Sequence, residues 1–151
     1  MAHAPDSVLL SSATVESGEG LAQHIRTGHH QFIADEPAAR GGGDLGPAPY
    51  QLLMGSLGAC TAITLKMYAE RKKWDLGKLV VRLKLIREPA GERVERVLDC
   101  ADTVTADQRA RLLEIAAKTP VTLTLSRALH IDTRFASTEP TEPTEPTGTT
   151  G

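Results

Sequence analysis

Residues 45–65 contain no charged side chain, and this stretch constrains the fold of the chain more than any other feature. A run of this length is either a membrane span or a helix buried inside a folded domain. Its glycines, prolines and polar residues make it a poor membrane span; they are Gly46, Pro47, Pro49, Gln51, Ser56 and Thr61. The sequence therefore predicts a buried central helix, and that helix carries Cys60.

The predicted helix begins near Pro49 and ends near Lys73. Proline is well placed in a first turn, because its missing N–H would have no partner there. Apolar residues lie nearly all round the first turns, namely Leu52, Leu53, Leu57, Cys60, Ile63 and Leu65. Charged residues appear only afterwards, at Lys66, Glu70, Arg71 and Lys73. We therefore expect the first half of the helix to be buried and the second half to emerge as an amphipathic helix.

The segment before the helix is predicted to be an antiparallel meander. Residues 7–16, 21–26 and 29–36 have β character, and glycines separate them. Residues 36–49 then form a loop rich in Gly and Pro, which can approach a neighbouring group closely.

The segment after the helix continues with strands and helices. Residues 78–89 alternate apolar and charged side chains, and residues 92–100 follow a turn, so the two are predicted to form a hairpin. Thr105 is expected to cap a helix over residues 106–118, which Pro120 ends or kinks. Residues 121–128 show no clear period, and residues 129–135 are predicted to be a strand. The fold class is α+β.

A chain of 151 residues is long enough for one domain with a core of its own. We assign residues 7–136 to this domain and residues 1–6 to a flexible N-terminus. Residues 137–151 repeat Thr-Glu-Pro without an apolar side chain, so we expect a disordered tail.

Composition excludes several functional classes. A net charge of −2 gives no broad attraction to nucleic acid or to an anionic membrane, and 3% aromatic residues give no stacking platform. The N-terminus lacks the pattern of a secretory signal, so we expect a cytoplasmic protein. Two cysteines without zinc-site spacing predict neither a disulfide scaffold nor a metal site, and no cofactor is expected.

The run GGGDLGPAPYQLLMGSLGACTAITLKMYAERKKW is followed by the hairpin, the helix DQRARLLEIAAK and the sequence TPVTLTLSRALHI. This order resembles the OsmC/Ohr family of thiol-dependent hydroperoxide reductases, over residues 7–135. The resemblance implies antiparallel sheets packed on a long buried helix, in an intertwined homodimer with active sites at the subunit interface. It also implies that Cys60 is the peroxidatic thiol.

Peroxidase chemistry requires the thiolate to attack the O–O bond of an organic hydroperoxide, which yields a sulfenic acid and an alcohol. A buried thiol ionises only where a cation or several hydrogen-bond donors favour the charged form. Cys60 lies beyond the first turn, where the helix dipole acts, so its partner must come from elsewhere. The resemblance implies an arginine from the N-terminal half, either Arg26 or Arg40. The Gly-rich loop favours Arg40, although a solvated loop residue is an equal alternative.

The sequence departs from the family at three positions. Gln51 stands where the resemblance places a carboxylate that would orient the arginine. Thr119 stands at the position of the second, resolving cysteine, and Thr122 at that of its accompanying histidine. Cys100 lies in a different part of the chain and is expected to serve in the core.

Two functions remain open. In the first, Cys60 reduces small organic or lipid hydroperoxides, and an external thiol regenerates it because no resolving cysteine is present. In the second, the same dimer binds a small hydrophobic ligand against residues 52–63 without chemistry.

Overall fold

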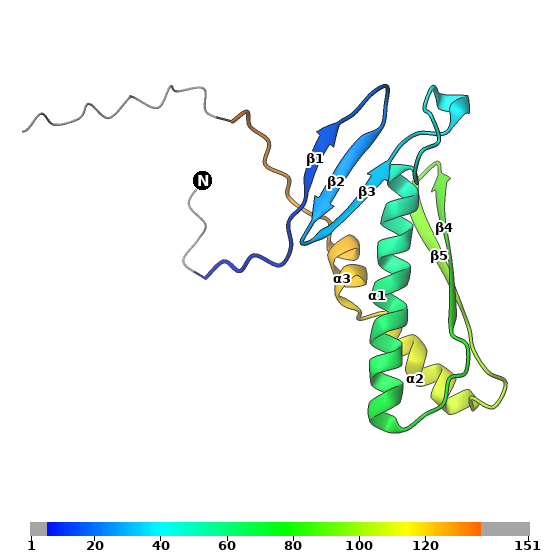
Figure 1. Ribbon diagram of the computed structural model, residues 1–151. Coiled ribbons are helices and arrows are strands. Elements are labelled where there is room, and N and C mark those ends of the chain that lie inside the picture. Colours follow the sequence, from blue (N-terminus) through cyan, green and yellow to red (C-terminus); the bar gives the residue numbers. More distant parts are fainter. Residues whose placement is uncertain (1–5, 137–151) are drawn as a thin grey trace, which may run out of the picture.

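The computed structural model describes residues 6–136 and shows a long helix, α1, with a β-hairpin along one side (Figure 1). A three-stranded sheet lies beyond the N-terminal end of α1, and two shorter helices pack on the helix. This arrangement confirms the predicted α+β class. The flexible N-terminus and the tail predicted from the sequence lie largely or wholly outside the described residues.

The predicted N-terminal meander is confirmed. Strands β1 (Thr14–Ser17), β2 (Gln23–Thr27) and β3 (His30–Ala34) form an antiparallel sheet in sequence order. The first strand is shorter than expected, because only its last residues pair with β2.

The loop between β3 and α1 is fixed by the buried side chain of Asp35. Its carboxylate accepts hydrogen bonds from the backbone N–H groups of Glu36, Gly43 and Leu45. Gly46 passes so close to β3 that an added Cβ would lie 1.9 Å from the carbonyl oxygen of Ile33. The loop therefore docks on the sheet and determines where α1 begins.

Helix α1 (Pro49–Lys72) matches the predicted bounds, with Pro49 in its first turn. Its buried residues form a single stripe with a spacing of four: Leu57, Thr61, Leu65 and Ala69. The prediction that the first half is buried all round is wrong for one chain, since Ile63 and Met67 expose 58% and 60% of their surface. The hairpin and the two short helices cover only one side of the helix.

By length and composition, Pro49–Lys72 is also a candidate membrane span. The stripe of buried residues nevertheless packs on β4, α2 and α3 in the described chain. This packing is typical of the central helix of a folded domain.

The predicted hairpin is confirmed as β4 (Val80–Glu88) paired with β5 (Gly91–Asp99). Helix α2 (Ala106–Ala116) follows, and Thr105 caps it by accepting from the N–H of Gln108, as predicted. The core lies where the second half of α1 meets α2 and the end of the hairpin. Its buried members are Leu65, Ala69, Leu76, Val104, Leu112 and Ala116.

Two expectations for the C-terminal part are wrong. Residues 121–128, which show no period in the sequence, belong largely to helix α3 (Pro120–Arg127), with Pro120 in its first turn. Residues 129–135 form no strand, since no sheet edge in the chain pairs with them. They extend from the body with Ile131 and Phe135 exposed (Figure 1).

Candidate functional site

Cys60 lies three turns into α1 and is half-buried, as a free thiol. Its neighbour Thr61 belongs to the buried stripe and is fully enclosed. Cys60 therefore sits at the border between the packed side of α1 and its uncovered apolar side, where a reactant can approach the sulfur.

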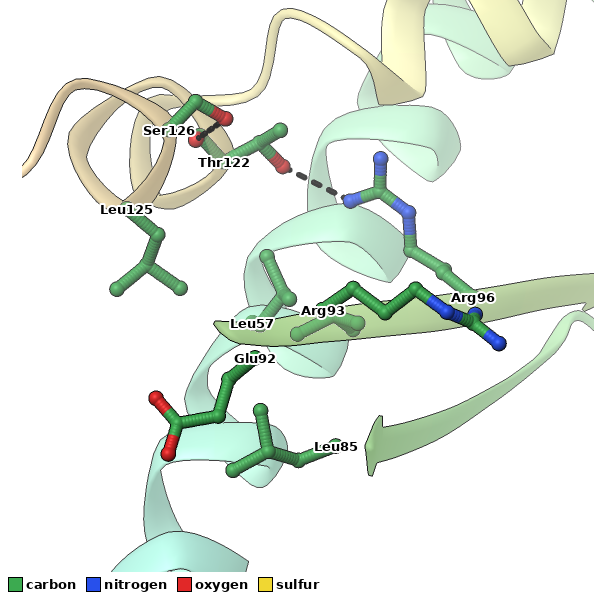
Figure 2. Close-up of a pocket in the computed structure, with 9 residues that line it drawn as sticks. Leu57, Leu85, Glu92, Arg93, Arg96, Thr122, Leu125 and Ser126 are labelled. Carbon is green, nitrogen blue, oxygen red and sulfur yellow. Dashed lines mark hydrogen bonds between the residues drawn. The ribbon is translucent and has the colours of Figure 1, made fainter. Parts of the chain in front are cut away.

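Arg96 reaches from β5 to α1 at the level of Cys60. One terminal nitrogen, Nη1, donates to Thr61 Oγ1 at 2.9 Å and to Thr122 Oγ1 at 2.8 Å. The other, Nη2, donates to the carbonyl oxygen of Ala116 at 2.8 Å. The guanidinium thus joins α1, the end of α2 and α3 (Figure 2).

The charge of Arg96 has no carboxylate partner among residues 6–136. The other arginines of the hairpin each pair across the strands: Arg82 with Asp99, Arg87 with Glu92, and Arg93 with Glu88. Burial lowers the pKa of the Arg96 guanidinium, and the electrostatic attraction of Cys60 raises it in opposition. The ionisable group that acts on this cation is therefore the thiol of Cys60.

Thr119 and Thr122 form the other side of this network. Thr119 is fully buried, and its hydroxyl lies 2.6 Å from that of Thr122. Thr122 Oγ1 also donates to the carbonyl oxygen of Ala116 and accepts from Arg96. The two positions at which the resemblance places a cysteine and a histidine thus hold an arginine in place.

The residues predicted to accompany Cys60 lie elsewhere in the single chain. Arg40 ends a short 3-10 helix, η1 (Ala38–Arg40), and lines a hollow together with Gln51 at the first turn of α1. About 13 Å of helix rise separates Gln51 from Cys60. Gln51 Oε1 accepts from the N–H of Ala48 and so caps the helix. Arg26 pairs with Glu16 on the exposed sheet.

Cys100 packs against the core near Leu65, Leu98 and Leu112. Four residues of extended chain, about 13 Å, separate it from Arg96 on the hairpin. This position agrees with the expected role of Cys100 in the core.

A cavity of about 360 Å³ lies between the hairpin, α1 and α3, next to Arg96 (Figure 2). Its lining includes Leu57, Leu85, Val94 and Leu125, with Arg96, Thr122 and Ser126 on the polar side. Glu92 and Arg93 also line it, but each is paired with another residue of the hairpin. Within the described chain, no group of three His, Cys, Asp or Glu side chains forms a metal site.

The sequence reasoning missed Arg96. It placed Val94, Leu98 and Cys100 on one face of a strand and treated Arg96 as an interruption of that face. A charged residue at an inward position of a strand is itself a signal, because such a charge needs a partner inside the fold.

Comparison with known proteins gives a family and a fold. A family model described as OsmC-like protein matches residues 41–134. No curated protein matches the chain.

Several solved structures match most of the chain. An OsmC-like protein from Mycoplasma pneumoniae is 18% identical with a TM-score of 0.67, over 80% of this chain and 89% of that one. The organic hydroperoxide resistance protein OsmC of Legionella pneumophila is 18% identical with a TM-score of 0.57, over 78% and 90%. The organic hydroperoxide resistance protein OhrB of Bacillus subtilis is 20% identical with a TM-score of 0.54, also over 78% and 90%. At these identities the likenesses establish the fold alone.

Proposed function

The chain belongs to the OsmC-like family, and from this premise we propose that it is a cytoplasmic thiol-dependent peroxidase that reduces organic hydroperoxides through Cys60. The observation that carries the proposal is the position of the half-buried cation Arg96, which interacts electrostatically with a free thiol on an accessible side of α1. A cation next to a thiol favours the thiolate, which is the nucleophile.

The chemical step balances without a cofactor. The Cys60 thiolate attacks one oxygen of the hydroperoxide, so that an S–O bond forms and the O–O bond breaks. The alkoxide leaves and takes up a proton as the alcohol, while Cys60 becomes a sulfenic acid. One external thiol then condenses with the sulfenic acid and releases water, and a second thiol releases Cys60 from the mixed disulfide.

Regeneration depends on an external thiol because Thr119 supplies none. Cys100 lies in the core, and we expect it to take no part in the cycle. The sulfenic acid persists until a reductant arrives, and it is exposed to further oxidation by excess peroxide. Arg40, for which no role is tested within one chain, remains the predicted alternative cation.

Labelling of the sulfenic acid tests this function. After a stoichiometric pulse of cumene hydroperoxide, a dimedone-type reagent followed by peptide mass spectrometry should modify Cys60 and leave Cys100 unmodified. Protein treated with cumyl alcohol, which lacks the O–O bond, is the control. An unmodified Cys60 at excess hydroperoxide would show that the proposal is wrong.

We also propose that the active form is a homodimer. Apolar residues on α1 and in both terminal segments lack cover in one chain, and they include Leu10, Ile63, Met67, Ile131 and Phe135. Contiguous apolar surface of this kind marks an interface. Light scattering coupled to size exclusion should give twice the mass of the chain, and Met67→Glu should shift it toward the monomer. A monomeric wild type at micromolar concentration would contradict the proposal.

A second candidate function is the binding of a small ligand without chemistry. The cavity beside Arg96 favours it, because apolar walls with a few polar groups are typical of ligand sites.

A further inference from the structure

The cavity beside Arg96 combines apolar walls with one uncompensated positive charge. Leu57, Leu85, Val94 and Leu125 provide the walls. The two other charged residues of the lining, Glu92 and Arg93, already pair with Arg87 and Glu88. The remaining charge is that of Arg96, which the fold holds by neutral oxygens alone within residues 6–136.

Arg96 has hydrogen-bonding capacity left for a ligand. A guanidinium carries five N–H donors. Both donors of Nη1 and one of Nη2 are used by Thr61, Thr122 and Ala116. The Nε–H and the second Nη2–H have no partner among the described residues. Neighbouring donors of this kind match the two oxygens of a carboxylate.

A partly buried charge without a counter-ion is costly, so an anion that enters the cavity gains more from Arg96 than it would from a solvated arginine. The apolar walls select against an inorganic anion, which would leave them in contact with a hydrated ion. The size, about 360 Å³, is near the lower end of ligand sites and suits a small molecule.

We propose that this cavity binds a small amphipathic monocarboxylate, whose carboxylate pairs with the free edge of Arg96 and whose alkyl chain lies against Leu57, Leu85, Val94 and Leu125. Cys60 is not part of the lining, so the site does not depend on peroxidase activity. The hydroxyls of Thr61 and Thr122 fix the guanidinium in the orientation that presents this edge.

Isothermal titration of the full chain with octanoate tests the site. We expect saturable binding of octanoate by the wild type and at least about tenfold weaker binding by Arg96→Met, which keeps the apolar volume and removes the charge. Octanamide, which has the same chain without the charge, should bind both proteins equally weakly. Arg82→Met is the matched control, because Arg82 lies on the same hairpin and pairs with Asp99 outside the cavity.

A second pair of variants covers the case in which Arg96→Met does not fold. Leu125 is 38% exposed on α3, so Leu125→Glu and Leu125→Gln should both fold. The carboxylate of the first should repel octanoate, and the neutral amide of the second should weaken binding less. Cys60→Ser should bind octanoate as the wild type does, which separates this site from the proposed catalysis. No binding by the wild type, or equal binding by the Leu125→Glu and Leu125→Gln proteins, would overturn the proposal.

Discussion

Replacement of Cys60 by serine should reduce hydroperoxide consumption to the uncatalysed rate, with dithiothreitol as the external thiol. A serine hydroxyl cannot accept the peroxide oxygen as a sulfenic acid does, so the first step of the cycle is lost. The measurement is the thiol-dependent loss of cumene hydroperoxide, followed at equal concentrations of folded wild type and variant.

Cys100→Ser is the matched control for this prediction. Cys100 packs against the core and lies about 13 Å along the hairpin from Arg96, so its removal should leave most of the activity in place. Equal activities of the wild type and Cys60→Ser would exclude Cys60 as the nucleophile. A large loss in Cys100→Ser, with the protein still folded, would instead assign a resolving role to Cys100.

The local signals in the sequence predicted most of the elements. Pro49 and the uncharged run that follows marked the start and extent of α1, and Thr105 marked the start of α2. These signals are local, because a cap or a first-turn proline acts through its own backbone. Helix α3 was missed although Pro120 marks its first turn. Its β-branched residues favour a strand, and the packing of α3 on α1 overrides that preference.

The site was predictable in part. Cys60 stood out because a motif surrounds it, whereas the importance of Arg96 depends on contacts with residues 26 and 35 positions away in the chain. No periodicity in β5 identifies such partners. The roles of Thr119 and Thr122 were equally hidden, since their interpretation as missing family residues describes what they replaced. In the structure their hydroxyls hold Arg96.

Replacement of Leu65 by alanine should lower the free energy of unfolding by about 3 kcal/mol. Leu65 is fully buried in α1 at the centre of the cluster formed with Leu112 and Ala116. The substitution removes apolar contacts and leaves a cavity that α2 and the hairpin cannot close completely. Urea denaturation followed by circular dichroism, at one fixed protein concentration, measures the change.

Leu113→Ala is the comparison, because Leu113 lies next to Leu112 on α2 but is 59% exposed. It should change the free energy of unfolding by only about 0.5 kcal/mol. The difference between the two variants reports on the position of the core, which lies at the second half of α1 and away from Cys60. Similar costs for both would mean that a partner subunit buries the outer face of α2. Since Cys60 lies outside this core, Leu65→Ala should lose stability without losing the sulfenic acid adduct at Cys60 under conditions in which it stays folded.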